Sequence, residues 1–246
     1  MSPLTRREAL SAFVAGSTVL AGERLALARE APPGPAATTP KALTGNHAVV
    51  PLPFPAGKLD GISERLITSH HDNNYAAAVR NLNRVEQDLA HISGETPPFV
   101  VAALRERELL FRNSKTLHET YFANLGGNGR RSGPIEAALA SAYGGTARWE
   151  EHFRATGLGL GGGSGWVILA LEIDTGALRT VGSGNHTQVL ANALPLLVMD
   201  MYEHSYQMDF GAAVPRYIDA FFANIRWDEV NRRLERSRAV VRGWSS

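Results

Sequence analysis

Beyond residue 60 the chain begins with apolar residues at helical spacing. They continue from Ile62 to Ile92 without a break, and Ser63 stands where an N-cap is expected. The segment 99–125 keeps the same period and stops at the glycines from Gly126 to Gly129. The pattern therefore predicts two long helices joined as a hairpin.

The pattern changes after this glycine run, because runs of strand length replace the long helical period. The runs 165–173 and 177–183 are joined by Asp174-Thr175-Gly176 and predict a β-hairpin. The sequence further predicts helices at 130–145, 147–158, 215–225 and 227–241 and a strand at 193–202. This order predicts the fold class α+β, with an N-terminal helical hairpin followed by a C-terminal α/β lobe that contains a small antiparallel sheet.

The first residues follow neither pattern. Arg6 and Arg7 precede a mildly apolar run from Ala9 to Ala21, and the small-residue pattern Ala26-Leu27-Ala28 follows. We interpret residues 1–28 as an export signal of the twin-arginine type, because the apolar run is too short and too weakly hydrophobic to remain as a membrane anchor. The alternatives are an ordinary secretion signal that happens to contain two arginines, or a frayed cytosolic tail. We expect a periplasmic or secreted protein with no membrane anchor after cleavage.

Residues 29–55 are rich in proline, alanine, threonine and glycine and have little periodicity. This composition predicts a disordered linker. We place an N-terminal helical hairpin domain at 56–128 and a C-terminal α+β domain at 129–246.

Composition narrows the chemistry. The 246 residues are 44% hydrophobic with a formal net charge of +1, so a substantial core is expected and neither nucleic acid nor an anionic membrane surface is indicated as a partner. The sequence contains no cysteine, which excludes disulfides and thiolate ligands. Any bound metal must therefore be held by histidine, aspartate or glutamate, and eight histidines are available.

One candidate pair lies in the otherwise apolar stretch MDMYEHSYQ. Asp200 and His204 are four residues apart, so they would share one face of a helix, or would converge if Asp200 ended a strand. An isolated pair of this kind is more often a hydrogen-bonded polar pair at the end of an element than a metal site. His70 and His118 could join it only if the fold brings them near, and spacing alone leaves both interpretations open.

Several motifs follow one another between about Pro51 and Ser245. They are PLPFPAGKLDGISERLITSHHDNNYAAAVRNLN, LHETYF, GGGSGWVIL, GSGNHTQVL, DMYEHSYQMDF and RYIDAFFANIRWDEV. In this order they resemble the iron/manganese superoxide dismutases, with their leading His-His helix, second-helix histidine, Gly-Ser-Gly-Trp strand and Asp-x-Trp-Glu-His-x-Tyr signature.

The resemblance implies a metal site and a reaction. It places the four metal ligands at His70, His118, Asp200 and His204, which would hold one Fe or Mn ion per subunit. The implied activity is that of a superoxide dismutase, which converts superoxide to dioxygen and hydrogen peroxide by redox cycling of the ion.

The resemblance also assigns roles around the ligands. It implies that His186 donates a hydrogen bond to metal-bound solvent, although this histidine could simply cap a strand end, and that Trp166 forms part of the site wall. Glu203 matches the glutamate that reaches across a dimer interface to His204 of the partner subunit. We therefore expect a homodimer or a tetramer.

Some positions depart from the family pattern. Asn74 stands where a second first-helix histidine is usual, Ala78 at the place of the gateway tyrosine, and Gln207 at the last tyrosine of the signature. The two positions that can carry the glutamine near the metal hold Ser114 and His186, and Tyr202 replaces the signature tryptophan.

Because of these departures, we expect dismutation to be slower or less selective than in typical members of the family. The alternative is a metal-binding protein of this fold with lost or altered activity, in a binding or peroxidase-like role. The choice between Fe and Mn stays open.

Overall fold

The computed structural model describes residues 40–244. The predicted export signal at 1–28 and residues 29–39 of the predicted linker lie outside the described residues. Among the helices of residues 40–244, none combines the length and the apolar character that crossing a membrane requires.

The first predicted helix is present, and it changes its winding at His70. It consists of α1 (Glu64–Ser69), the π-helical segment η4 (His70–Tyr75) and α2 (Ala76–Ala90). Ser63 caps it as expected, because its hydroxyl accepts a hydrogen bond of 3.1 Å from the backbone N–H of Leu66. A π-helical turn of this kind is often found at a functional site.

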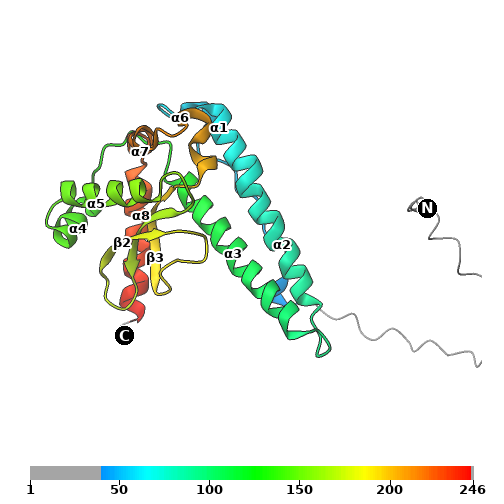
Figure 1. Cartoon of the computed structure of the whole chain (residues 1–246). Coiled ribbons are helices and arrows are strands. Elements are labelled where there is room, and N and C mark those ends of the chain that lie inside the picture. Colours follow the sequence, from blue (N-terminus) through cyan, green and yellow to red (C-terminus); the bar gives the residue numbers. More distant parts are fainter. Residues whose placement is uncertain (1–39, 245–246) are drawn as a thin grey trace, which may run out of the picture. The chain divides into compact units, whose positions relative to one another are not determined.

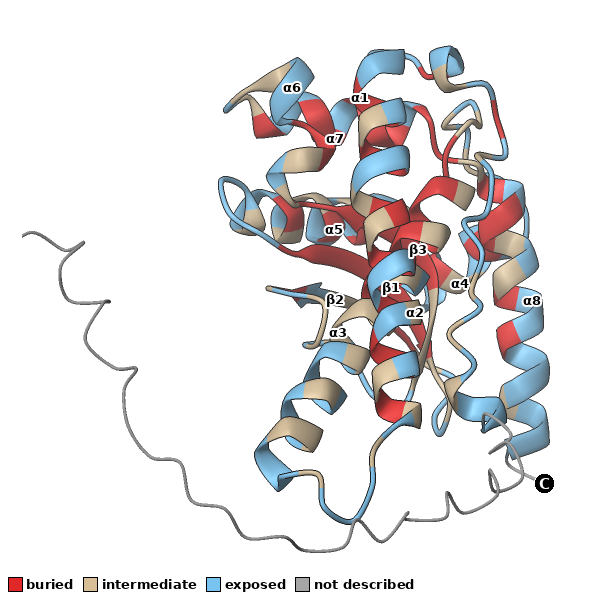
Figure 2. Ribbon diagram, turned by 90° about the vertical axis from the view of Figure 1, so that its right-hand side faces the viewer, coloured by how far each residue is buried: buried red, intermediate tan, exposed pale blue. Residues whose placement is uncertain are grey.

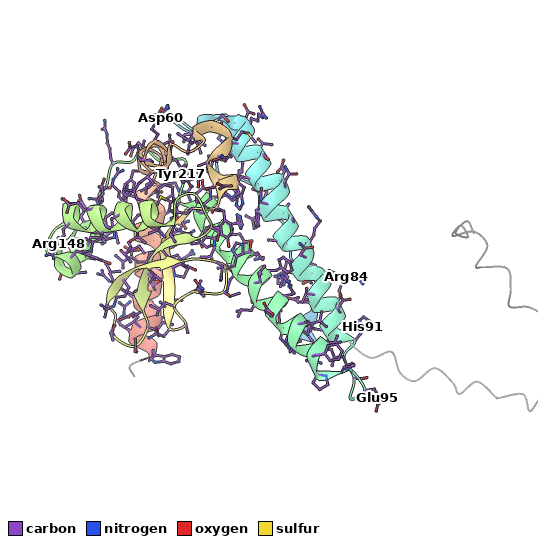
Figure 3. All side chains as sticks on the ribbon, viewed as in Figure 1. Asp60, Arg84, His91, Glu95, Arg148 and Tyr217 are labelled. Atoms are coloured by element: carbon purple, nitrogen blue, oxygen red, sulfur yellow. The ribbon has the colours of Figure 1, made fainter. Side chains whose placement is uncertain are left out.

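The second long helix, α3 (Pro98–Ala123), runs beside α2 and completes the predicted hairpin (Figure 1). Arg84, His91 and Glu95 mark the end of the hairpin that lies far from the sheet (Figure 3). The hairpin is followed by a loop in which Gly127 donates its N–H to the carbonyl of Asn224, 3.0 Å away. The domain boundary predicted between residues 128 and 129 falls within this loop, and this loop is hydrogen-bonded to the C-terminal half of the chain.

The predicted antiparallel sheet is also present. Its strands are β1 (Trp166–Glu172), β2 (Leu178–Ser183) and β3 (Ala193–Asp200), in the order β2-β1-β3. Trp166 at the start of β1 is paired with Ser183 on one side and with Asp200 on the other. The C-terminal ends of β2 and β3 therefore lie beside the N-terminal end of β1, at the same end of the sheet. Figure 2 shows the buried residues gathered along β1 and β3.

Of the remaining elements, α4, α5 and α8 contact strands of this sheet. The C-terminal half contains α4 (Pro134–Tyr143), α5 (Thr146–Leu160), α7 (Val214–Ala223) and α8 (Trp227–Trp244). The short segments η2 (Lys41–Leu43), η3 (Ala56–Lys58), η5 (Glu203–Ser205) and α6 (Gln207–Phe210) were not predicted, because one turn carries too little periodicity to be recognised. The α+β fold class, with a helical hairpin before a lobe with a small antiparallel sheet, is confirmed.

The linker prediction is wrong for residues 45–54, which are bound to the helical hairpin. The backbone N–H groups of Gly45 and His47 donate to Glu86 and Asn83 of α2, at 2.9 and 2.8 Å. Phe54 is buried in the core. These contacts join residues about 40 positions apart, so a local scan for periodicity does not detect them.

Candidate metal centre

Four elements bring the predicted ligands together. His70 opens the π-helical segment η4, His118 lies on α3, Asp200 is the last residue of β3, and His204 lies in η5. One ligand atom from each lies within 4.8 Å of all the others. The structure therefore joins residues that the sequence alone left apart.

The cluster is centred on one oxygen of Asp200. The Nε2 atoms of His70, His204 and His118 lie 3.1, 3.2 and 3.6 Å from Asp200 Oδ2. The other carboxylate oxygen, Oδ1, accepts a hydrogen bond of 2.9 Å from the backbone N–H of Tyr202. The carboxylate is thus oriented so that Oδ2 faces all three imidazoles.

Buried nitrogens of the cluster lack hydrogen bonds. Both ring nitrogens of His70 and Nε2 of His118 are buried without a hydrogen-bond partner among the described residues. Leaving such an atom unsatisfied costs about 1–3 kcal/mol. The Nδ1 of His118 donates to the Ser114 carbonyl at 2.7 Å, which leaves the lone pair on Nε2, facing the cluster. Nitrogen and oxygen ligands in this arrangement fit a coordinated Fe or Mn ion.

The pKa shifts of His118, His70 and Asp200 favour the protonation states in which these side chains bind a metal. Burial, together with the neighbouring His70, lowers the pKa of His118 to about 3, and burial also lowers the pKa of His70. Burial by itself would raise the pKa of Asp200, but His204 and His70 hold that pKa well below its usual range. The buried imidazoles are therefore neutral and the carboxylate ionised, as metal binding requires.

The backbone of Asp200 is anchored by residues that the sequence did not single out. Tyr217 of α7, labelled in Figure 3, donates its hydroxyl to the Asp200 carbonyl at 2.7 Å, and the Ser205 hydroxyl donates to the same oxygen at 2.8 Å. A tyrosine after a proline on an amphipathic helix carries no signal for this role, because the contact depends on how α7 packs against the end of β3.

His186 lies beside the cluster, on the loop that follows β2. The indole Nε1 of Trp166 donates to His186 Nδ1 at 3.0 Å, and the Tyr202 ring stacks on the His186 ring with centroids 4.8 Å apart. Burial lowers the pKa of His186. A neutral ring that accepts at Nδ1 carries its proton on Nε2. Hydrogen bonding of His186 to bound solvent stays a prediction, as does the role of Trp166 as a wall.

The altered positions are filled in a different way from the family pattern. Ala78 is buried, and Tyr75 packs its ring beside His118 with centroids 6.1 Å apart. The Tyr75 hydroxyl donates to Glu119 at 2.7 Å and accepts from the N–H of Val50 at 2.9 Å. This hydroxyl is therefore hydrogen-bonded both to the segment 45–54 and to α3.

Glu203 and Gln207 lie at the surface next to the cluster. Both are exposed, and the Glu203 carboxylate forms no hydrogen bond or ion pair within residues 40–244. The side chain of His204 is itself 25% exposed, in contrast to the fully buried His70. The predicted contact of Glu203 with the partner subunit stays a prediction.

Comparison with known proteins agrees with this geometry. Residues 131–233 match the family model described as iron/manganese superoxide dismutases, C-terminal domain. The chain is 43% identical over 189 residues to an iron superoxide dismutase of Cupriavidus metallidurans, a match that covers 76% of this chain and 96% of that protein. It is 32% identical over 188 residues to an iron superoxide dismutase of Aquifex aeolicus, covering 73% and 87%. It is 30% identical over 196 residues to superoxide dismutase (Mn) 1 of Halobacterium salinarum, covering 78% and 96%.

Proposed function

The chain belongs to the iron/manganese superoxide dismutase family, and on this premise we propose that it converts superoxide to dioxygen and hydrogen peroxide at one bound Fe or Mn ion. The observation that carries the proposal is the convergence of His70, His118, Asp200 and His204 within 4.8 Å. These four residues would hold the ion, which would supply one-electron redox chemistry when bound.

The residues of the chain hold and orient this site. The Ser114 carbonyl fixes the tautomer of His118, and the Tyr202 N–H fixes the rotation of the Asp200 carboxylate. The neutral His186 ring, held at Nδ1 by Trp166, keeps an N–H at Nε2 that can hydrogen-bond solvent in the site.

The test is the decay of superoxide catalysed by the protein after separate loading with iron and with manganese. Asp200→Ala should abolish both stoichiometric metal binding and decay, because it removes the oxygen on which the three imidazoles converge. Asp219→Ala is the matched control, since Asp219 is 71% exposed on α7 and pairs only with Arg154 among the described residues. If the wild-type protein binds a full complement of metal but does not accelerate the decay of superoxide, it would be a metal-binding protein that has lost turnover.

Iron is the metal that we propose. The iron enzyme of Cupriavidus metallidurans is 43% identical to the chain, against 30% for the manganese enzyme of Halobacterium salinarum. The iron-loaded protein should therefore have the higher activity. A manganese-loaded protein that is more active would reverse this assignment.

We propose that the protein acts as a homodimer, or as a tetramer of such dimers. The exposed Glu203, unpaired within the described residues, supports a contact with His204 of the partner subunit. Sedimentation analysis should give a dimer or a tetramer, and Glu203→Ala should shift the distribution toward monomer. Glu151→Ala, at an exposed position of α5, is the control. A wild-type protein that sediments as a monomer would contradict the proposal.

We also propose export by the twin-arginine route to the periplasm or the exterior. The paired Arg6 and Arg7 before a short apolar run support it. Replacing both arginines by lysine should leave the protein in the cytoplasmic fraction. Export that continues unchanged would point to an ordinary secretion signal.

A further inference from the structure

The loop that carries His186 has few internal constraints. It spans residues 184–192 between β2 and β3 and contains neither helix nor strand. Its internal hydrogen bonds are short-range, such as that from the Gly184 N–H to the Gln188 side chain at 3.0 Å. Its local sequence therefore leaves the position of His186 to be set by contacts with other elements.

Packing beneath the loop is incomplete. A partly open pocket of about 480 Å³ lies between α3, the sheet and this loop, and its lining includes Leu117, Ile168, Val189 and Leu190. Close packing holds side chains in place elsewhere in the core, but it cannot do so where a hollow of this size lies under the chain. Hydrogen bonds hold the loop instead: one comes from Trp166 of β1 to His186, and another comes from α3 on the pocket side.

Asn113 supplies the bond from α3. Its side-chain amide donates to the backbone carbonyl of His186 at 2.8 Å, and Asn113 also lines the pocket. The residue beside it, Ser114, accepts the Nδ1–H of His118 through its carbonyl at 2.7 Å. One turn of α3 therefore holds both the ligand His118 and the loop of His186, whose rings lie 6.2 Å apart.

We propose that Asn113 is a positioning residue, which sets the place of the His186 ring relative to the metal ligands. The inference rests on the proposed function for its effect on catalysis, but the contact itself does not depend on it. When the amide is removed, the loop loses its bond to α3, and His186 shifts away from Trp166 and the ligands. Displacements of about 1 Å in a catalytic site can lower rates by about 100-fold, so we expect a loss of about 10-fold or more.

The experiment compares Asn113→Ala with Thr116→Ala in the full chain. Thr116 lies one turn further along α3 and lines the same pocket, but its hydroxyl has no hydrogen bond to the loop among the described residues. Asn113→Asp is the second variant, because it keeps the shape of the side chain and loses the donor. Asn113→Gln keeps an amide donor and should recover part of the lost activity.

Two readouts are required. The first is superoxide decay at equal iron content, which should fall about 10-fold in Asn113→Ala and Asn113→Asp and stay unchanged in Thr116→Ala. The second is hydrogen exchange of the Trp166 indole N–H in the metal-free full chain, followed by NMR and assigned by its loss in Trp166→Phe. Exchange should be faster in the Asn113 variants, because the indole loses its bond to His186.

The two readouts separate the inference from the proposed function. Unchanged indole exchange in Asn113→Ala overturns the inference, whatever happens to activity. Faster exchange with unchanged decay overturns the catalytic part of it. If the wild-type protein does not catalyse decay at all, the proposed function fails, while faster exchange in Asn113→Ala still supports the positioning of His186.

Discussion

Asp200 has partners at both carboxylate oxygens and at its backbone carbonyl. Oδ2 faces the three histidines, Oδ1 accepts from Tyr202, and the carbonyl accepts from Tyr217 and Ser205. A ligand held in this way does not have to be reoriented when a metal binds, and such supporting bonds typically contribute 10–100-fold to metal affinity or activity. The residue-scale property of the site is thus the orientation of a single carboxylate.

Tyr217→Phe tests this support. The variant removes one of two donors to the Asp200 carbonyl, so we expect the free energy of unfolding to fall by about 1 kcal/mol in urea denaturation. Metal affinity should fall by about 10-fold. Tyr206→Phe is the control, because the buried Tyr206 hydroxyl accepts from Gly162 at 3.0 Å and forms no hydrogen bond to Asp200 among the described residues. Equal metal affinity in the two variants would argue against a supporting role of Tyr217.

At the scale of elements, the segment 45–54 is attached to the helical hairpin through a buried glutamate. The side chain of Glu86 on α2 is only 2% exposed, and it accepts from the N–H of Gly45 at 2.9 Å. Its carboxylate also lies 2.8 Å from His47 Nε2 and 2.7 Å from Arg112 of α3. Three parts of the chain therefore meet at one carboxylate.

Glu86→Gln should lower stability and change its dependence on pH. Burial by itself raises the pKa of Glu86, but bonds from His47 and Gly45 and the charge of Arg112 lower it overall. A lowered pKa contributes stability above the unfolded value of about 4.3, and this contribution is lost as the pH falls through the folded pKa. We expect the variant to lose about 1–3 kcal/mol at pH 7 and to be less sensitive to acid than the wild type.

The measurement is urea denaturation at several pH values. The control is Glu151→Gln, which alters an exposed glutamate of α5 and should leave the curve unchanged. Parallel pH curves for wild type and Glu86→Gln would show that this carboxylate does not control attachment of the segment.

At the scale of the whole molecule, the metal ligands join two halves of the chain. His70 and His118 come from the helical hairpin, and Asp200 and His204 come from the lobe that contains the sheet. A second connection lies at the glycine loop, where Gly127 N–H bonds to the Asn224 carbonyl. Stability of the described unit should therefore depend on both the metal and this backbone contact.

Metal removal should lower the melting temperature. Because the four ligands are assembled only in the folded chain, a bound ion stabilises it by about 2.7 kcal/mol when its free concentration is 100 times the Kd. Thermal unfolding with and without chelator measures the difference. The same comparison in Asp200→Ala should give no shift, and a shift of equal size there would place the stabilising ion elsewhere.

Gly127→Ala should weaken the backbone connection. An added Cβ would collide with backbone atoms of Ile225 and Arg226, which cannot move as a flexible side chain can. We expect a loss of about 1–3 kcal/mol in urea denaturation. Gly159→Ala in α5 is the control, since its Cβ meets nothing within 4 Å and helix propensity favours alanine by about 1 kcal/mol. Equal effects of the two substitutions would contradict the contact.

The sequence by itself determined the elements and the types of ligand. Periods of helix and strand predicted the hairpin and the antiparallel sheet, because those periods are local properties of the chain. The absence of cysteine limited the ligands to nitrogen and oxygen, and the resemblance to the iron/manganese superoxide dismutases assigned them to His70, His118, Asp200 and His204.

Only the tertiary structure decided the contacts that hold these ligands and His186. Attachment of residues 45–54 to α2, the engagement of the Tyr75 hydroxyl, and the bond from Asn113 to His186 join positions 25 or more residues apart. Such contacts depend on how whole elements pack, and neither residue type nor spacing encodes their distance or direction. The convergence of four ligands within 4.8 Å is also a tertiary property, because it depends on how η4, α3, β3 and η5 are arranged relative to one another.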